Sequence, residues 1–279
     1  MNYHTVKLLS IIDKALIIAY QESTEILKKT LANEGFQYQV LRQKEQAEHQ
    51  NFSSSYLCLL NHRKAWEIAA EEGKKTLVIE ADFVPVVGFG QLPLPFNSKN
   101  QRVGIAWLYT CAPQLYNVSV DGYADGFSAS TVAYIITPDA AKYLIDLEVK
   151  VRKEIGTNCY SAWDSNIDSF LRDKNFINYI PFRNYGEHGG IPNLEHHRHG
   201  LSRTHRADIL YNSLAFIPIY ANQERENHLH LFVIRLLARI KGLLRLICGK
   251  YLRCKLVKKS KTPIRLVTFS IYRQLTIRL

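Results

Sequence analysis

The first 80 residues alternate between short apolar segments and longer amphipathic ones. Segments 15–20, 37–41 and 76–79 have the length and the apolar, β-favouring content of strands. Between them, residues 21–32 and 52–72 carry apolar side chains at helical spacing. The order strand, helix, strand, helix, strand predicts a parallel sheet with helices on its faces. The sequence therefore predicts an α/β fold.

The same fold class is expected to continue beyond residue 100. Strands are predicted at 103–109, 115–120 and 131–136, and helices at 138–146 and 163–171. Residues 185–201 are rich in His and Gly and are predicted to form a loop.

The charge of the chain is unevenly distributed. Residues 227–279 hold 13 Lys and Arg and no Asp or Glu, which leaves 23 basic and 25 acidic residues in 1–226. We therefore predict a near-neutral domain over 1–226 and a basic tail over 227–279. A domain that grips nucleic acid would carry basic side chains on its own surface, so no nucleic-acid partner is expected for 1–226.

Two carboxylates follow the apolar run that ends at Ile79. Side chains alternate along a strand, so Glu80 and Asp82 point to the same side. Carboxylates held this close repel each other unless a cation or a proton lies between them. Mg²⁺ and Mn²⁺ take oxygen ligands of this kind and often bind a substrate phosphate as well. The pair predicts a metal–diphosphate site, and the alternative is a solvated turn.

Several segments, in order, resemble one known family. These are the helix 56–66 with Asn61 followed by His62, the run 69–82 that ends in Glu80-Ala81-Asp82, the segment 126–144, and Trp163-Asp164. They are similar to the family 25 glycosyltransferases, which include lipopolysaccharide-biosynthesis enzymes of bacteria and collagen galactosyltransferases of animals. Asn61 stands where the family has Ser, and Ala81 replaces the middle Asp of its acidic motif.

The resemblance implies a GT-A-like fold, with a Rossmann-like mixed sheet flanked by helices. It also implies a nucleotide-sugar donor, with a UDP-sugar preferred, and a glycan or glycolipid acceptor. A divalent cation, Mn²⁺ or Mg²⁺, would be held by Asp82 with Glu80 beside it. The catalytic base would be Asp164 or Asp125, and the alternative role of Asp164 is a helix N-cap.

Four further residues are predicted to contact the donor. Tyr20 ends the first strand, where its ring could stack on the base, or it could be ordinary packing. His62 projects from the helix before the acidic strand, and His188 lies in the His-rich loop. Arg206 could bind diphosphate oxygens, or it could pair with Asp208 or Glu195.

A second enzyme class is suggested by the His-rich loop. His188, His196, His197 and His199 lie close in sequence to Glu187 and Glu195, and such side chains can bind zinc in a metal-dependent hydrolase. The segment has no His-Glu-x-x-His motif, which counts against this alternative.

The tail contains a predicted amphipathic helix over residues 229–256. Arg235, Arg239, Lys250 and Arg253 fall on one face, opposite a run of Leu and Ile. Basic residues recur too often for a membrane span, so the helix is expected to lie on an anionic membrane surface with its basic side chains near headgroup phosphates. The alternatives are a helix packed on the domain with its basic face in solvent, and a nucleic-acid contact.

The sequence thus predicts a glycosyltransferase of lipopolysaccharide or cell-surface polysaccharide biosynthesis. It is expected in the cytoplasm, peripherally attached to the inner face of the membrane, because the five cysteines show no disulfide pattern and no signal peptide is evident. The remaining alternative is a non-enzymatic protein that binds membrane or nucleic acid through the basic tail.

Overall fold

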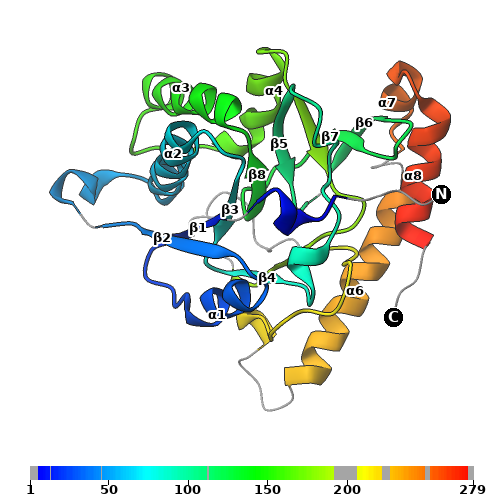
Figure 1. Ribbon diagram of the computed structural model, residues 1–279, viewed down its shortest axis with the longest axis horizontal. Helices are drawn as coiled ribbons and strands as arrows, with labels where there is room; N and C mark the ends of the chain where they lie inside the picture. Colours follow the sequence, from blue (N-terminus) through cyan, green and yellow to red (C-terminus); the bar gives the residue numbers. More distant parts are fainter. Residues whose placement is uncertain are drawn as a thin grey trace.

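The computed structural model describes residues 6–12, 14–44, 46–111, 113–191, 206–221, 227–248 and 252–275. Within these residues, an eight-stranded sheet has the order β2-β1-β3-β8-β5-β9-β7-β6 (Figure 1). Its strands are β1 Lys14–Ala19, β2 Gln37–Arg42, β3 Thr76–Glu80, β5 Val103–Trp107, β6 Gln114–Val118, β7 Ala124–Phe127, β8 Ala133–Ile136 and β9 Ile177–Ile180. A separate pair is formed by β4 Phe83–Pro85 and β10 Gly186–His188.

The sheet is mixed, as predicted. Strands β2, β1 and β3 are parallel, β8 runs antiparallel to β3 and β5, and β9 is parallel to β5. The predicted α/β class with helices around a mixed sheet is confirmed. The described helices of the main body are α1 Glu25–Asn33, α2 Ser54–Glu72, α3 Pro138–Glu154 and α4 Ile167–Arg172.

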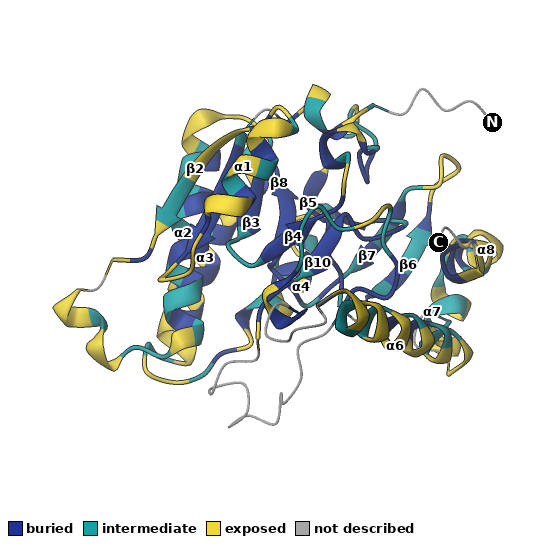
Figure 2. Ribbon diagram, turned by 90° about the horizontal axis from the view of Figure 1, so that it is seen from below, coloured by how far each residue is buried: buried dark blue, intermediate teal, exposed yellow. Residues whose placement is uncertain are grey.

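Helices cover both faces of the sheet because successive side chains of each strand point to opposite faces. Leu16 and Ile18 of β1 belong to the core beneath α2 and α3, whereas Ala15 and Ile17 belong to the core that includes α1. The central strands are therefore buried on both faces (Figure 2). This arrangement explains why their sequences are continuous apolar runs.

Local signals fix the ends of the two long helices. The Ser53 hydroxyl accepts from the Tyr56 N–H at 3.2 Å at the start of α2, and Gly73 ends this helix in the left-handed region with φ 67°. Thr137 caps α3, and Pro138 occupies its first turn. Helix α3 runs to Glu154, eight residues further than the predicted end at residue 146.

The predicted single helix over residues 229–256 is wrong. Helix α6 ends at Ile247 (Asn227–Ile247), and a separate short helix α7 (Cys254–Lys259) precedes α8 (Pro263–Leu275). Lys250, predicted on the basic face, lies outside the described residues. Among the described residues, no helix combines the length and the apolar content that a membrane-spanning segment needs.

The basic side of α6 packs on the domain. Arg235 donates to the buried carboxylate of Glu187 and, at 2.8 Å, to the carbonyl of Ala207. Arg239 donates to Gln274 of α8 at 2.6 Å. The expectation that this side faces solvent or headgroup phosphates is therefore wrong for Arg235 and Arg239. The opposite, apolar side of the helix is exposed (Figure 2).

Candidate metal and donor site

The candidate site lies where the winding of the sheet changes direction. Strand β1 lies between β2 and β3 and is parallel to both. The chain passes from β1 through α1 to β2 on one side, and then returns from β2 through α2 across β1 to β3 on the other side (Figure 1). Glu80 pairs with Ile18 at the carboxyl ends of β3 and β1, and the Ala81 N–H donates to the Ile18 carbonyl at 2.8 Å. Open α/β sheets bind ligands at such a switch point.

Three potential metal ligands converge at the carboxyl ends of β1 and β3. Antiparallel pairing of β10 with β4 places His188 opposite Phe83, and Nε2 of His188 lies 2.9 Å from Oδ2 of Asp82. One ligand atom each from Glu80, Asp82 and His188 lies within 4.8 Å of the other two. All three side chains are only partly buried, so an ion could reach them from solvent. The two carboxylates suit Mn²⁺ or Mg²⁺, and an imidazole is a common ligand of divalent transition metals.

Asp82 and His188 shift each other's pKa. Burial raises the pKa of Asp82, but the neighbouring charge and hydrogen bond of His188 lower it by more, so this pKa lies below its ordinary value. Burial lowers the pKa of His188, but the charge and hydrogen bond of Asp82 and the charge of Glu80 together raise it by more, so this pKa lies above its ordinary value. Oδ1 of Asp82 is buried and has no hydrogen-bond partner among the described residues. Such an acceptor is what a cation would satisfy.

A glycine pair closes over the two ligands. The Gly189 N–H donates to the Asp82 carbonyl at 2.8 Å. A Cβ on Gly190 would lie 2.1 Å from Oδ2 of Asp82 and 3.1 Å from Nε2 of His188. No side chain fits at Gly190 without displacing these two groups. The His- and Gly-rich segment, predicted as a loop, thus begins with strand β10 and a close backbone approach to Asp82.

Glu80 is held by a chain of buried hydrogen bonds. Its Oε1 accepts from the Thr131 hydroxyl at 2.8 Å and lies 3.3 Å from Nε2 of His62. Nδ1 of His62 lies 2.9 Å from the Tyr134 hydroxyl, which accepts from Nε1 of Trp66 at 2.8 Å. Because an indole N–H can only donate, the Tyr134 hydroxyl accepts from Trp66, and it can donate its own hydrogen to Nδ1 of His62. In that arrangement Nε2 of His62 carries the hydrogen that points to Glu80.

This chain changes the predicted role of His62. Its side chain is fully buried, so it cannot touch a donor directly as predicted. His62 instead positions Glu80 from behind, as residues around metal ligands commonly do. His62 also belongs to a second group of residues, with Cys58 and Glu80, whose potential ligand atoms lie within 4.8 Å of one another.

Arg206 stabilises the strand that carries His188. It donates to the carbonyls of His188 and, at 3.1 Å, of Gly190, and its guanidinium lies 3.6 Å from the centre of the Tyr220 ring. The predicted alternative of a pair with Asp208 is not observed, because Asp208 binds Arg273 and Gln274. The charge of Arg206 also lowers the pKa of Asp82, in agreement with the position of Arg206 beside the backbone of His188.

Tyr20 lies at the same end of the strands as the three potential metal ligands. It follows β1, is 41% exposed, and its backbone carbonyl accepts from Arg42 at 2.5 Å at the end of β2. Asn61 of α2 donates to the Ala19 carbonyl at 3.1 Å and fixes the end of β1. The ring of Tyr20 is accessible to a planar ligand, and its predicted stacking on a base remains a prediction.

The two predicted catalytic carboxylates lie in different places. Asp164 is in the short helical turn Trp163–Asn166, and burial, together with the charge of Glu80, raises its pKa. The ring of the neighbouring Trp163 lies 5.3 Å from the ring of His62, so this turn lies beside the residues that hold Glu80. Asp125 is on β7 and accepts from Arg172 at 2.6 Å, four strands along the sheet from β3. The structure does not bring Asp125 to the candidate site.

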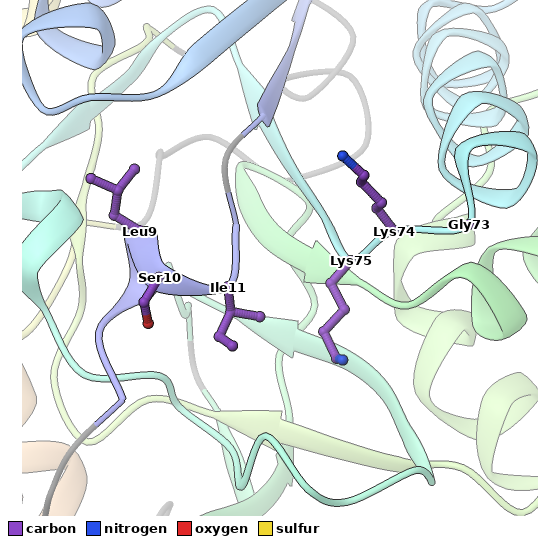
Figure 3. Close-up of a pocket in the computed structure, with 6 residues that line it drawn as sticks. All are labelled: Leu9, Ser10, Ile11, Gly73, Lys74 and Lys75. Atoms are coloured by element: carbon purple, nitrogen blue, oxygen red, sulfur yellow. The ribbon is translucent and has the colours of Figure 1, made fainter.

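Two other regions contain residues that could bind a ligand. His196, His197, His199 and Glu195, on which the hydrolase alternative depends, lie outside the described residues. A pocket of about 370 Å³ is lined by residues 9–11 and 73–75 (Figure 3). Those residues precede β1 and β3, at the amino ends of the strands, so this pocket is separate from the candidate site.

Sequence reasoning missed the residues that support the ligands. Thr131, Tyr134 and Trp66 were assigned no role, and Gly190 was treated only as part of a loop. A polar hydroxyl inside the apolar run Ala133–Ile136 was the available signal for Tyr134, because a buried tyrosine needs a partner for its hydroxyl.

Comparisons with known proteins give a distant structural likeness. No family model and no curated protein matches the chain. A solved structure of a glycosyltransferase involved in the glycosylation of the major capsid of PBCV-1 is 11% identical, with a TM-score of 0.41, over 61% of this chain and 82% of that chain. A likeness at this level carries no argument about function, and membership of family 25 remains a prediction.

Proposed function

We propose that the protein is a glycosyltransferase that moves a sugar from a nucleotide-sugar donor to a glycan or glycolipid acceptor. The observation that carries the proposal is the convergence of Glu80, Asp82 and His188 at the carboxyl edge of β1 and β3, within 4.8 Å. The unpartnered, buried Oδ1 of Asp82 fits a bound cation. A Mn²⁺ or Mg²⁺ ion bound there would neutralise charge on the leaving diphosphate.

The described residues suit distinct parts of this reaction. Glu80, Asp82 and His188 would hold the cation, and the exposed ring of Tyr20 would stack on the base of the nucleotide, with UDP as the preferred nucleotide. Asp164, whose pKa is raised by burial, would accept the proton of the acceptor hydroxyl. Lipopolysaccharide or another cell-surface polysaccharide is the proposed product, which rests on the family resemblance alone.

The test is a panel of nucleotide sugars, with hydrolysis or transfer measured with Mn²⁺ and with EDTA. The wild-type chain should consume one donor with Mn²⁺ and lose this activity in EDTA. Asp82→Ala should abolish the activity, whereas Asp146→Ala, which removes an exposed carboxylate of α3, should leave it unchanged. Activity that persists in EDTA and in Asp82→Ala would show that the cation site is misassigned. If no nucleotide sugar is bound or consumed, the proposed function itself fails.

A further inference from the structure

The outer side of α6 is an unusual surface. Large apolar side chains recur along it at intervals of three or four residues, and all of them are exposed, including Phe232 (63%) and Ile247 (79%). The other exposed members between these two are Val233, Leu236, Leu237, Ile240 and Leu244. Single exposed apolar residues are ordinary, but a continuous stripe of this kind marks an interaction surface.

The orientation of α6 is fixed by buried polar contacts on its inner side. Ala238 and Gly242 face the domain, and a Cβ on Gly242 would lie 2.8 Å from Cβ of Asp208. Arg235 is held by Glu187 and by the Ala207 carbonyl. Turning the apolar stripe inward would leave the buried Glu187 carboxylate without this partner, which is costly. The stripe therefore stays outward.

A cluster of exposed basic residues follows the stripe along the chain. The cluster extends from the N-cap of α7 to the first turn of α8, and its exposed members are Arg253, Lys255, Lys258, Lys259, Lys261 and Arg265. Helix α7 packs against α8, which in turn packs against α6, so the basic cluster and the apolar stripe belong to one group of helices (Figure 1). Residues 227–279 contain no Asp or Glu that could neutralise the cluster.

We propose that α6 and α7 dock this protein on an anionic bilayer, with the apolar stripe in the acyl boundary and the basic cluster at the lipid headgroups. An anionic bilayer matches both surfaces, because its hydrocarbon interior can bind the apolar stripe and its charged headgroups can bind the basic cluster. A second copy of the chain would cover the stripe with its own stripe, but its residues 227–279 would bring no negative charge to the basic cluster. A nucleic acid would pair with the basic cluster and leave the stripe in water.

The docking surface also bears on the candidate site. Arg235 of α6 holds Glu187, the residue directly before His188 on β10. Docking would therefore hold Glu80, Asp82 and His188 in a fixed position relative to the bilayer. This consequence rests on the proposed function, and it favours a lipid-linked acceptor over a soluble glycan.

The test is flotation of the full chain with vesicles of phosphatidylcholine alone and of phosphatidylcholine mixed with phosphatidylglycerol. The wild-type chain should float only with the anionic vesicles, and less so at high salt. Leu236→Ser with Ile240→Ser should weaken binding at least about tenfold, since both exposed side chains would lose apolar contact. Ile26→Ser with Val120→Ser, an equally apolar pair exposed elsewhere, should bind as the wild type does.

The basic cluster is tested by Lys258→Ser with Lys259→Ser, which should weaken binding about 30-fold, because each basic side chain near an anionic surface contributes about a factor of five. The control is Lys99→Ser with Lys150→Ser, two exposed lysines elsewhere. The proposal is overturned if the chain does not float with anionic vesicles, or floats equally with neutral ones. It is also overturned if the wild type is a dimer that Leu236→Ser with Ile240→Ser converts to monomers, or if double-stranded DNA binds and vesicles do not. None of these outcomes depends on glycosyl transfer.

Discussion

The hydrogen-bond chain that supports Glu80 depends on the hydroxyl oxygen of Tyr134. Tyr134→Phe removes the hydroxyl that accepts from Trp66 at 2.8 Å and lies 2.9 Å from Nδ1 of His62, and all three side chains are fully buried. Each of the two buried groups left without a partner costs about 1–3 kcal/mol, so the free energy of unfolding should fall by roughly 2–6 kcal/mol. His62 would also lose the contact that fixes its hydrogen toward Glu80, and Mn²⁺ affinity should fall about 10- to 100-fold.

Urea denaturation and Mn²⁺ titration together check this prediction. The matched control is Tyr179→Phe, whose hydroxyl accepts from Asn100 at 2.8 Å in a partly buried position. The control should cost about 1 kcal/mol and leave Mn²⁺ affinity unchanged, because it removes one hydrogen bond far from Glu80. The reasoning is refuted if Tyr134→Phe costs no more than Tyr179→Phe and binds Mn²⁺ as the wild type does.

Three further changes have defined outcomes. Gly190→Ala should weaken Mn²⁺ binding at least about tenfold in a calorimetric titration, because its Cβ would lie 2.1 Å from Oδ2 of Asp82. An unchanged Mn²⁺ affinity would contradict the close contact between the Gly190 backbone and Asp82. Asp164→Asn should lower kcat about 100- to 10,000-fold. In the wild type the rate should rise with pH as Asp164 loses its proton, at a pH above the ordinary carboxyl pKa of 3.8 because burial raises this pKa; a flat profile would argue against a base role. Arg273→Met breaks the buried pair with Asp208 and should cost about 3–5 kcal/mol in urea denaturation, and a loss below about 1 kcal/mol would show that the pair contributes little.

The sequence predicted the local elements around the site well because their signals are local. The apolar run Thr76–Glu80, the helix Ser54–Glu72 and the acidic pair that follows are set by neighbouring residues, capping groups and Gly73. The parallel order of the first three strands also follows from their connections. These features located Glu80 and Asp82 at the edge of the sheet.

The partner of Asp82 could not be assigned in the same way. Asp82 and His188 are 106 residues apart, and they meet because the short strands β4 and β10 pair outside the main sheet. Strands of three residues have too little pattern to identify from sequence. The role of Tyr134 could not be predicted for a related reason. The sequence of β8 does not show that the Tyr134 hydroxyl contacts His62, which lies on α2.

The orientation of α6 shows a different limit. Periodicity identified the helix and its two faces, but it could not decide which face packs on the domain. That choice depends on Glu187, which is buried in β10, and on Gln274 of α8. Because these partners attract Arg235 and Arg239, the basic side packs inward and the apolar side faces out.

The central claim is that Glu80, Asp82 and His188 hold a divalent cation that binds the diphosphate of the donor. Calorimetric titration of UDP into the full chain, with Mn²⁺ and then with EDTA, tests it most directly. The wild type should bind UDP with Mn²⁺ present, and this binding should disappear in EDTA and in Asp82→Asn, which keeps the shape of the side chain and removes its charge. UDP binding that is equal in EDTA and in Asp82→Asn would contradict the claim.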